Sequence, residues 1–213
     1  MLARRHTRVI IDAMNAAIIV AHPDDEIIWA GGFVLQHRDW DWCVLALCRA
    51  DDPDRAPKFR RVCELIGVDG AISDLDDSNP LQPIDPHSEI GGRVLERLGG
   101  REWDLVLTHG PNGEYGHERH RQTHQVVAAL VECGELRTER LWTFAYEAAS
   151  PAGDCHPAPW ADFTVDLSPE QLAEKRHIVR DEYGYTANGF EVRACISPEA
   201  FSIMRPGNEE LLP

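Results

Sequence analysis

The sequence predicts an α/β protein built on a mostly parallel, doubly wound sheet, with ligands bound at the carboxyl ends of its strands. Short, continuous apolar runs alternate with amphipathic segments through most of the 213 residues. Continuous runs are typical of strands buried on both faces, and strands that alternate with helices favour parallel connections. No repeat or long linker interrupts the chain, so we expect one domain over residues 1–213.

The first half of the chain supplies three predicted strands, each followed by a predicted helix. The strands are expected at 16–22, 41–49 and 69–75, and the helices at 25–38, 56–68 and 88–100. The first helix contains a glycine pair, Gly31 and Gly32, and the third stops at another, a common way to end a helix. The Pro- and Asp-rich stretch 76–88 is expected to form a surface loop.

The second half continues the alternation. Strands are expected at 103–110, 140–147, 162–168 and 199–205, and helices at 117–134 and 169–183. Ser168 and Pro169 have the residue types that favour the N-cap and the first position of the last helix.

Composition excludes several classes of partner. The formal net charge of −15 argues against nucleic acid or an anionic membrane, because both bind cationic surfaces. No apolar run approaches the ~20 residues that a membrane span needs, and no cleavage site follows the N-terminal apolar block. We therefore expect a cytoplasmic protein. Its six cysteines are scattered without a C-x-x-C pair, which favours free thiols over a disulfide framework.

The segment "AHPDDE" (21–26) places a histidine, a proline and three consecutive acids directly behind an apolar run. A helix dipole favours acids in a first helical turn by about 0.3–1 kcal/mol each. That effect accounts for one or two of the acids and leaves His22 unexplained. Three acids near a core need a compensating positive charge, and a bound cation is the most direct one.

A second cluster of polar residues, "THGPNGEYGHERHRQTH" (108–124), contains four histidines. In a helix that begins near Gly116, His117, His120 and His124 would share one face. A solvated polar face would explain His124, and less readily the other two. His22 and His109 each lie at the end of a predicted strand, so both clusters are expected at the same edge of the sheet.

Imidazole and carboxylate groups at one edge favour a metal site. Zinc accepts nitrogen and oxygen donors at about 2.0–2.2 Å, and its catalytic sites keep three protein ligands and a water. These donors favour Zn²⁺, with Fe²⁺ or Co²⁺ as alternatives. A carboxylate beside the metal could accept a proton from the metal-bound water, as metal-assisted hydrolysis requires.

"AHPDDE" together with "YGHERH" resembles the PIG-L / LmbE-like zinc deacetylases. The likeness extends to "RRVCELIGV", "LSPEQLAEKRHIVRDEY" and "EAFSIMR", and so covers most of the chain. It implies a three-layer Rossmann-like fold. It also implies removal of an N-acetyl group from an N-acetylglucosamine-type sugar or conjugate by zinc-activated water.

The resemblance assigns roles to five residues of the two motifs. His22, Asp25 and His120 would be the metal ligands. Asp24 would be the general base, and His117 would stabilise the oxyanion and protonate the leaving amine.

Other family positions imply supporting roles. Tyr115 would approach the reacting carbonyl, Arg49 would bind substrate, and Glu26 would support its loop. Arg60 or Arg61 with Glu64 matches a family R…E pattern whose role, substrate or scaffold, stays open.

Two departures from the family pattern bear on the site. Glu118-Arg119 replaces the usual Pro-Asp between the paired histidines, so a carboxylate that supports a ligand is lost or moved to Glu118. Cys48-Arg49-Ala50 replaces the usual Thr-Arg-Gly. A non-catalytic sugar- or nucleotide-binding module and a metallohydrolase for another amide or ester are therefore kept as alternatives. An amino-sugar substrate is the expected partner, and a homo-oligomer stays open.

Overall fold

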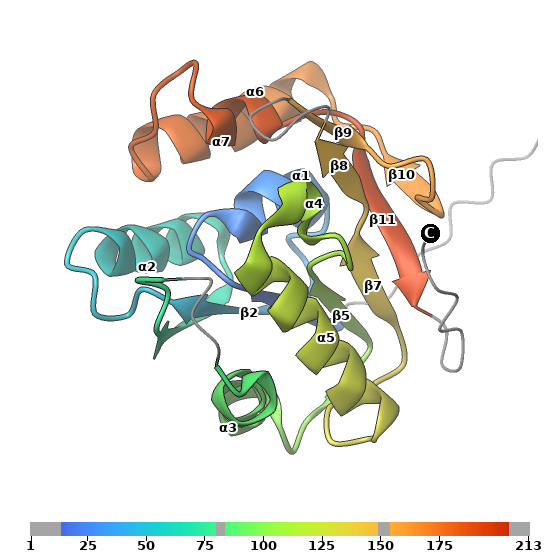
Figure 1. Ribbon diagram of the computed structural model, residues 1–213. Coiled ribbons are helices and arrows are strands. Elements are labelled where there is room, and N and C mark those ends of the chain that lie inside the picture. Colours follow the sequence, from blue (N-terminus) through green and yellow to red (C-terminus); the bar gives the residue numbers. More distant parts are fainter. Residues whose placement is uncertain (1–13, 80–83, 149–153, 205–213) are drawn as a thin grey trace, which may run out of the picture.

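The computed structural model describes residues 14–79, 84–148 and 154–204. A seven-stranded sheet forms its centre, with five parallel strands and two at one edge that pair antiparallel (Figure 1). In spatial order the strands are β10 (Phe163–Val165), β11 (Glu199–Met204), β7 (Leu141–Phe144), β5 (Leu105–Thr108), β1 (Asn15–Val20), β2 (Asp41–Cys48) and β3 (Asp69–Leu75). The predicted mostly parallel sheet is confirmed.

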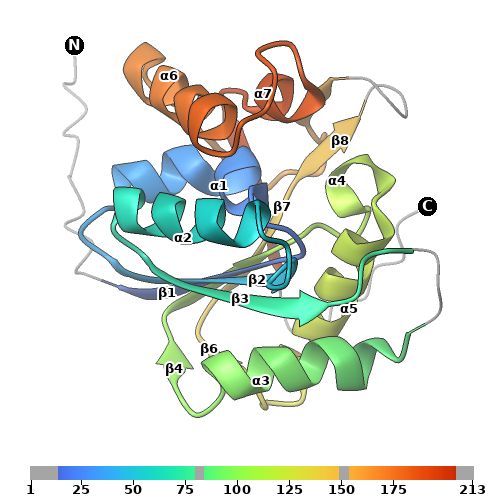
Figure 2. The same cartoon turned by 90° about the vertical axis from the view of Figure 1, so that its left-hand side faces the viewer.

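Helices cover both faces of the sheet and complete three layers. The helices are α1 (Asp25–Gln36), α2 (Arg55–Ile66), α3 (Gly92–Leu98), α4 (Gly113–Gly116), α5 (Glu118–Glu132), α6 (Pro169–His177) and α7 (Phe190–Ala194). Two π-helical turns, η1 (His87–Gly91) and η2 (Ile178–Glu182), adjoin α3 and α6. Helices α1 and α2 lie on one face and α3 and α5 on the other, while α6 and α7 pack outside α1 (Figure 2).

Strand β1 shows why its sequence is continuously apolar. Ala16, Ile18 and Val20 pack on the α1 side, whereas Ala17 and Ile19 pack on the α3 and α5 side. Successive side chains of a strand alternate between faces, so a strand covered on both faces needs apolar residues throughout.

Helix α1 is enclosed by the sheet on one side and by α6 on the other. All residues from Asp25 to Leu35 are buried, which explains a helix that is apolar all round. Gly32, the second residue of the glycine pair, permits the close approach of the chain that leads into α6. A Cβ atom at Gly32 would lie 2.3 Å from Leu167 Cδ2, far inside van der Waals contact.

The predicted helices and long strands all occur, with boundaries shifted by a few residues. Ser168 accepts a hydrogen bond from the Gln171 backbone and forms the expected cap of α6. The predicted strand 140–147 is divided into β7 and β8 (Tyr146–Ala148), and residues 178–182 of the last helix form η2. The short strands β4 (Glu102–Trp103), β6 (Arg137–Thr138) and β9 (Cys155–Pro157) were not predicted, because two or three residues carry no periodicity.

Two further findings concern the cysteines and the described helices. All six cysteines are free thiols. None of the described helices combines the length and the apolar character that crossing a membrane requires. Residues 80–83 of the expected loop and Arg205 of the expected last strand lie outside the described residues.

A buried ion pair joins the C-terminal elements to α1. Lys175 Nζ lies 2.6 Å from Glu199 Oε1, and both side chains are fully buried. The Glu199 carboxylate also accepts hydrogen bonds from the backbone N–H groups of Gly32 and Phe33. Strand β11, helix α6 and the middle of α1 therefore meet at one charged group.

We expect Glu199→Gln to lower the free energy of unfolding by about 3–5 kcal/mol, because it leaves the Lys175 ammonium buried without a countercharge. Glu174→Gln is the matched control. Its pair with Arg38 is about half exposed, so its loss should cost less than about 1 kcal/mol. Urea unfolding of both variants measures the difference, and a loss below 1 kcal/mol for Glu199→Gln would contradict the expectation.

Candidate metal centre

The two histidine-containing motifs meet where the strand order reverses direction. The first motif follows β1 and the second follows β5, and these two strands are parallel neighbours. From β1 the chain runs toward β3 on one side, and from β5 toward β7 on the other. Such a switch point leaves a crevice at the carboxyl ends of the strands. A cavity of about 380 Å³ lies there, lined by both motifs and by residues of α2 and α7.

Three donor atoms form a nearly equilateral triangle in this crevice. His22 Nδ1 lies 3.2 Å from Asp25 Oδ2 and 3.2 Å from His120 Nε2, and the latter two are 3.3 Å apart. Donors around a tetrahedral zinc ion at about 2.0–2.2 Å are roughly 3.3–3.6 Å apart. The distances therefore fit one divalent ion held by His22, Asp25 and His120, the three ligands expected from the sequence.

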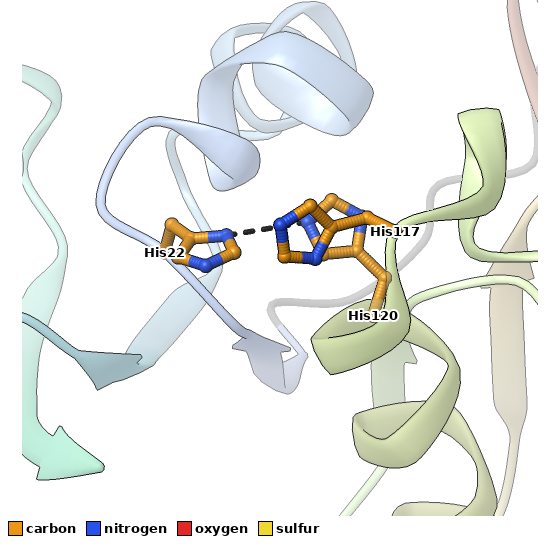
Figure 3. Close-up of side chains that lie close together, drawn as sticks. All are labelled: His22, His117 and His120. Carbon is orange, nitrogen blue, oxygen red and sulfur yellow. Dashed lines mark hydrogen bonds between the residues drawn. The ribbon is translucent and has the colours of Figure 1, made fainter. Parts of the chain in front are cut away.

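Carboxylates on the far side of each imidazole orient these donors. His22 Nε2 lies 3.1 Å from Asp77 Oδ2, and His120 Nδ1 lies 2.6 Å from Glu114 Oε2. An ionised carboxylate can only accept, so the ring protons lie on these outer nitrogens. His22 Nδ1 and His120 Nε2, which the dashed line in Figure 3 joins, then direct lone pairs at each other. Both also face Asp25 Oδ2, an arrangement that requires a cation.

The pKa values reflect the same demand for positive charge. Burial lowers the pKa of His120, but Asp25 and Glu114 outweigh it and raise that pKa to about 10. Burial raises the pKa of Asp25, yet His120 and His22 hold it well below its usual range. A proton on His120 can thus supply the charge that a metal ion would supply in its place.

Other donor combinations in the described chain fit less well. His109 accepts a hydrogen bond from Ala21 N–H at Nε2 and faces Glu114 at Nδ1, so neither nitrogen is available. Cys48 lies near His22 and Asp77, but burial raises the pKa of its thiol and disfavours the thiolate. His117 lies within 4.8 Å of the nitrogens of both His22 and His120 and could also reach an ion.

Asp24 stands beside the donors with its own set of partners. Its Oδ2 accepts hydrogen bonds from Arg55, at 3.0 Å, and from the Tyr185 hydroxyl. Burial and the neighbouring Asp25 raise the pKa of Asp24 to about 6, against the opposing effects of Tyr185 and Arg55. A carboxyl with that pKa is a suitable general base near neutral pH.

Glu26 supports the turn, as its place in the sequence suggests. Its Oε2 accepts the Asp24 backbone N–H at 2.9 Å, and its Oε1 accepts the Tyr183 hydroxyl. Burial raises the pKa of Glu26 to about 8. The three acids are thus stabilised separately: Asp24 by Arg55 and Tyr185, Asp25 by imidazoles, and Glu26 by a phenol and a backbone N–H.

His117 projects toward the donors from the residue that precedes α5. Its ring lies 4.8 Å from that of His22 and 4.6 Å from that of His120 (Figure 3). Its Nδ1 is buried without a hydrogen-bond partner among the described residues. Burial, and then His120 and His22, lower the pKa of His117 to about 4.

The remaining predicted site residues are partly in place. Tyr115 lines the cavity, and so does Arg49, which pairs with Asp77 at 3.0 Å. Arg60 and Arg61 are exposed on α2, and Arg61 pairs with Glu182, so neither lies at the cavity. His124 is not part of a solvated face: its Nδ1 lies 2.9 Å from the His109 carbonyl.

Sequence reasoning missed four residues that line the site or orient its donors. These are Arg55, Asp77, Glu114 and Tyr185. Arg55 could have been sought, because helices that follow strands of such a sheet begin at the ligand edge. The suggestion that the supporting carboxylate moved to Glu118 is wrong, since Glu114 holds His120 and Glu118 faces Gln122 instead.

Backbone strain is concentrated at this site. Among the described residues, the non-glycine residues with positive φ are Asp24 at 116°, Arg49 at 76° and Glu114 at 57°. Each contributes a side chain to the cavity or to its donors. Such conformations cost about 1–3 kcal/mol each and persist where the surrounding structure enforces them.

Fold and site together define the class: a three-layer α/β protein with imidazole and carboxylate donors gathered at the switch point of its sheet. Comparison with known families agrees. The sequence model of the PIG-L family, described as GlcNAc-PI de-N-acetylase, matches residues 17–131, more than half of the chain. The chain therefore belongs to the PIG-L family.

Curated relatives are named as deacetylases. The chain is 26% identical to the 1D-myo-inositol 2-acetamido-2-deoxy-alpha-D-glucopyranoside deacetylase of Mycobacteroides abscessus, over 79% of this chain and 75% of the relative. It is 27% identical to the protein of the same name from Corynebacterium diphtheriae, over 55% of this chain and 52% of that protein. The chain thus spans about half to three quarters of these relatives.

Solved structures share the fold. The N,N'-diacetylchitobiose deacetylase from Pyrococcus horikoshii aligns with a TM-score of 0.69 and 16% identity, over 92% of this chain and 85% of that one. The 4-carboxy-2-hydroxymuconate hydratase from Pseudomonas putida aligns with a TM-score of 0.64 and 15% identity, over 94% and 100%. A deacetylase and a hydratase therefore share this architecture, and the fold alone does not specify the reaction.

We expect the purified protein to bind one Zn²⁺ per chain and His120→Ala and Asp25→Ala to lose stoichiometric binding, because each removes one corner of the donor triangle. His156→Ala is the control, since His156 is exposed and contacts only Glu147 in the described structure. Elemental analysis after dialysis measures the metal content. Equal zinc in the wild-type protein and both ligand variants would show that the assignment is wrong.

Proposed function

We propose that this protein is a metal-dependent hydrolase that removes the N-acetyl group from an N-acetylglucosamine-type sugar conjugate. The observation that supports it best is the triangle of His22, Asp25 and His120 donors with the Asp24 carboxyl beside it. Asp25 Oδ2 lies next to His22 Nδ1 and His120 Nε2, whereas Oδ2 of its neighbour Asp24 accepts hydrogen bonds from Arg55 and Tyr185. The adjacent residues Asp25 and Asp24 would thus supply a metal ligand and a separate general base.

Zn²⁺ suits the nitrogen and oxygen donors, and when bound it would lower the pKa of its water and polarise the amide carbonyl. Asp24 accepts a proton from the attacking water. The Arg55 guanidinium and the Tyr185 hydroxyl fix the position of its Oδ2 during that transfer. The water oxygen bonds to the carbonyl carbon, and the C–N bond then breaks.

His117 serves the other half of the reaction. Its imidazole N–H donates a hydrogen bond to the oxyanion, a contact typically worth about 3–4 kcal/mol in the transition state. The amine is a poor leaving group until its nitrogen is protonated. The lowered pKa keeps the His117 imidazole neutral near pH 7, so it protonates that nitrogen by passing on the proton that Asp24 took from the water. The products are acetate and a free amino sugar.

The cavity lining favours a neutral, hydroxyl-rich substrate. Its arginines, Arg49 and Arg55, are already paired with Asp77 and Asp24. Tyr115 and Phe190 add aromatic surface, and Asp52 and Glu191 add acceptors for hydroxyl groups. This agrees with the relatives' names, which describe an uncharged N-acetylglucosamine joined to inositol. We further propose that the substrate is an amino sugar and that the protein acts in the cytoplasm.

We expect Asp24→Asn to lower kcat by about 10²–10⁴-fold while zinc stays bound, because the amide cannot accept the water proton. Acetate release from an N-acetylglucosaminyl-inositol substrate, with and without a chelator, measures the effect. Asp39→Asn, an exposed carboxyl away from the cavity, is the charge-matched control. Full activity of Asp24→Asn, or activity indifferent to the chelator, would refute the proposed hydrolysis.

We expect Arg49→Met to raise KM about tenfold or more with kcat little changed, because it removes a charged donor at the cavity wall. Methionine keeps a β-carbon, so the backbone strain at φ 76° is the same in both proteins. Arg38→Met, whose partner is Glu174, controls for loss of a surface cation. A fall in kcat at unchanged KM would place Arg49 in the chemical step instead.

A further inference from the structure

The proposed chemistry leaves the conformation of Glu114 unexplained. Its φ of 57° and ψ of −63° lie near the γ-turn region that is rare and strained for any residue with a side chain. Glycine would adopt this conformation at much lower cost. The carboxylate is also fully buried, which adds a desolvation cost. Two unfavourable features at one residue indicate that its side chain is needed there.

Each oxygen of the Glu114 carboxylate has partners from the site. Oε2 lies 2.6 Å from His120 Nδ1 and 2.9 Å from His109 Nδ1. Oε1 accepts the backbone N–H of Gly110 at 2.7 Å. The two imidazoles that share Oε2 are stacked, with their centroids 3.8 Å apart. One carboxylate thus sets the orientation of two parallel rings.

These contacts continue from the second motif to the first. The Nε2 of His109 accepts the Ala21 backbone N–H at 2.9 Å. Ala21 immediately precedes His22, so the path runs from Glu114 through His109 to the end of β1. Both sides of the donor triangle are therefore positioned by the same buried carboxylate.

We propose that Glu114 is a positioning residue for the metal centre, which fixes the tautomer and the ring plane of His120 directly and the place of His22 through His109. The inference rests on the proposed metal site. In this proposal Glu114 supplies the carboxylate that supports a ligating histidine, a role for which the sequence suggested Glu118. Glu118 cannot take that part, because its side chain is 38% exposed and lies on Arg121 and Gln122.

Replacing Glu114 should weaken metal binding without removing a ligand. In Glu114→Gln the amide is nearly isosteric, but it loses the charge that favours Nδ1–H on both histidines. Loss of a carboxylate that orients a ligating imidazole typically costs 10–100-fold in metal affinity. Glu114→Gly removes the carboxylate and relaxes the backbone at φ 57°, so strain and positioning are separated.

The experiment measures Zn²⁺ affinity by competition with a chromophoric chelator, and the visible absorption spectrum after loading with Co²⁺. We expect both Glu114 variants to bind Zn²⁺ 10–100-fold more weakly than wild type, with an altered Co²⁺ spectrum. Glu118→Gln is the matched control: it removes a carboxylate near the same histidines and should stay within about twofold of wild type.

Unchanged Zn²⁺ affinity and Co²⁺ spectra in both Glu114 variants would overturn the inference, as would an equal loss in Glu118→Gln. Thermal unfolding of the metal-free proteins tests whether the role of Glu114 is purely structural. In that case the Glu114 variants would be less stable than wild type, and their folded fraction would bind Zn²⁺ with unchanged affinity. If wild-type protein binds no metal at this site, the proposed function fails as well. The wild-type titration therefore distinguishes the two failures.

Discussion

One electrostatic constraint governs the arrangement of this site: buried carboxylates and imidazole lone pairs lie close together, and they require positive charge among them. Asp24, Asp25 and Glu26 are 5%, 3% and 1% exposed, and a carboxylate at such depth is unfavourable without a partner. Each receives a different one, and Asp25 is directed to the point where His22 and His120 converge. A divalent ion bound there, as we propose, would satisfy all three donors at once. The sheet topology meets this need, because the parallel neighbours β1 and β5 end side by side and bring the two motifs within reach of each other.

Strain and function coincide in the molecule. Asp24, Arg49 and Glu114 adopt backbone conformations that favour glycine. Asp24 immediately precedes α1, Arg49 immediately follows β2, and Glu114 lies within the short helix α4. The packed elements leave these connecting residues little freedom to relax. The side chains that we propose as general base, substrate contact and orienting carboxylate are thereby held in place before any ligand binds. Preorganisation of this kind reduces the reorganisation required during reaction.

Much of the fold was predictable, because long strands and helices carry strong periodicity. The run 16–22 and the helices that begin at Asp25 and Arg55 were placed within a few residues. The residues of the two motifs were predictable because their types are chemically unusual for a core. Arg55, Asp77 and Tyr185 were not, because each comes from a separate stretch of chain and meets the site only through the tertiary fold. Glu114 was quoted within a motif, but its role depends on a backbone conformation that sequence patterns do not encode.

Because helix α1 is enclosed by segments that come late in the chain, its packing can be completed only late in synthesis. The family match ends at residue 131, yet α1 is covered by α6 and anchored by Glu199 of β11. Tyr183 and Tyr185, which hold Glu26 and Asp24, also come from that late segment. During synthesis the acidic turn is therefore made well before the residues that complete its surroundings. Until residues 169–199 have been added, α1 lacks its cover of α6 and its anchor at Glu199, and Asp24 and Glu26 lack their tyrosine partners.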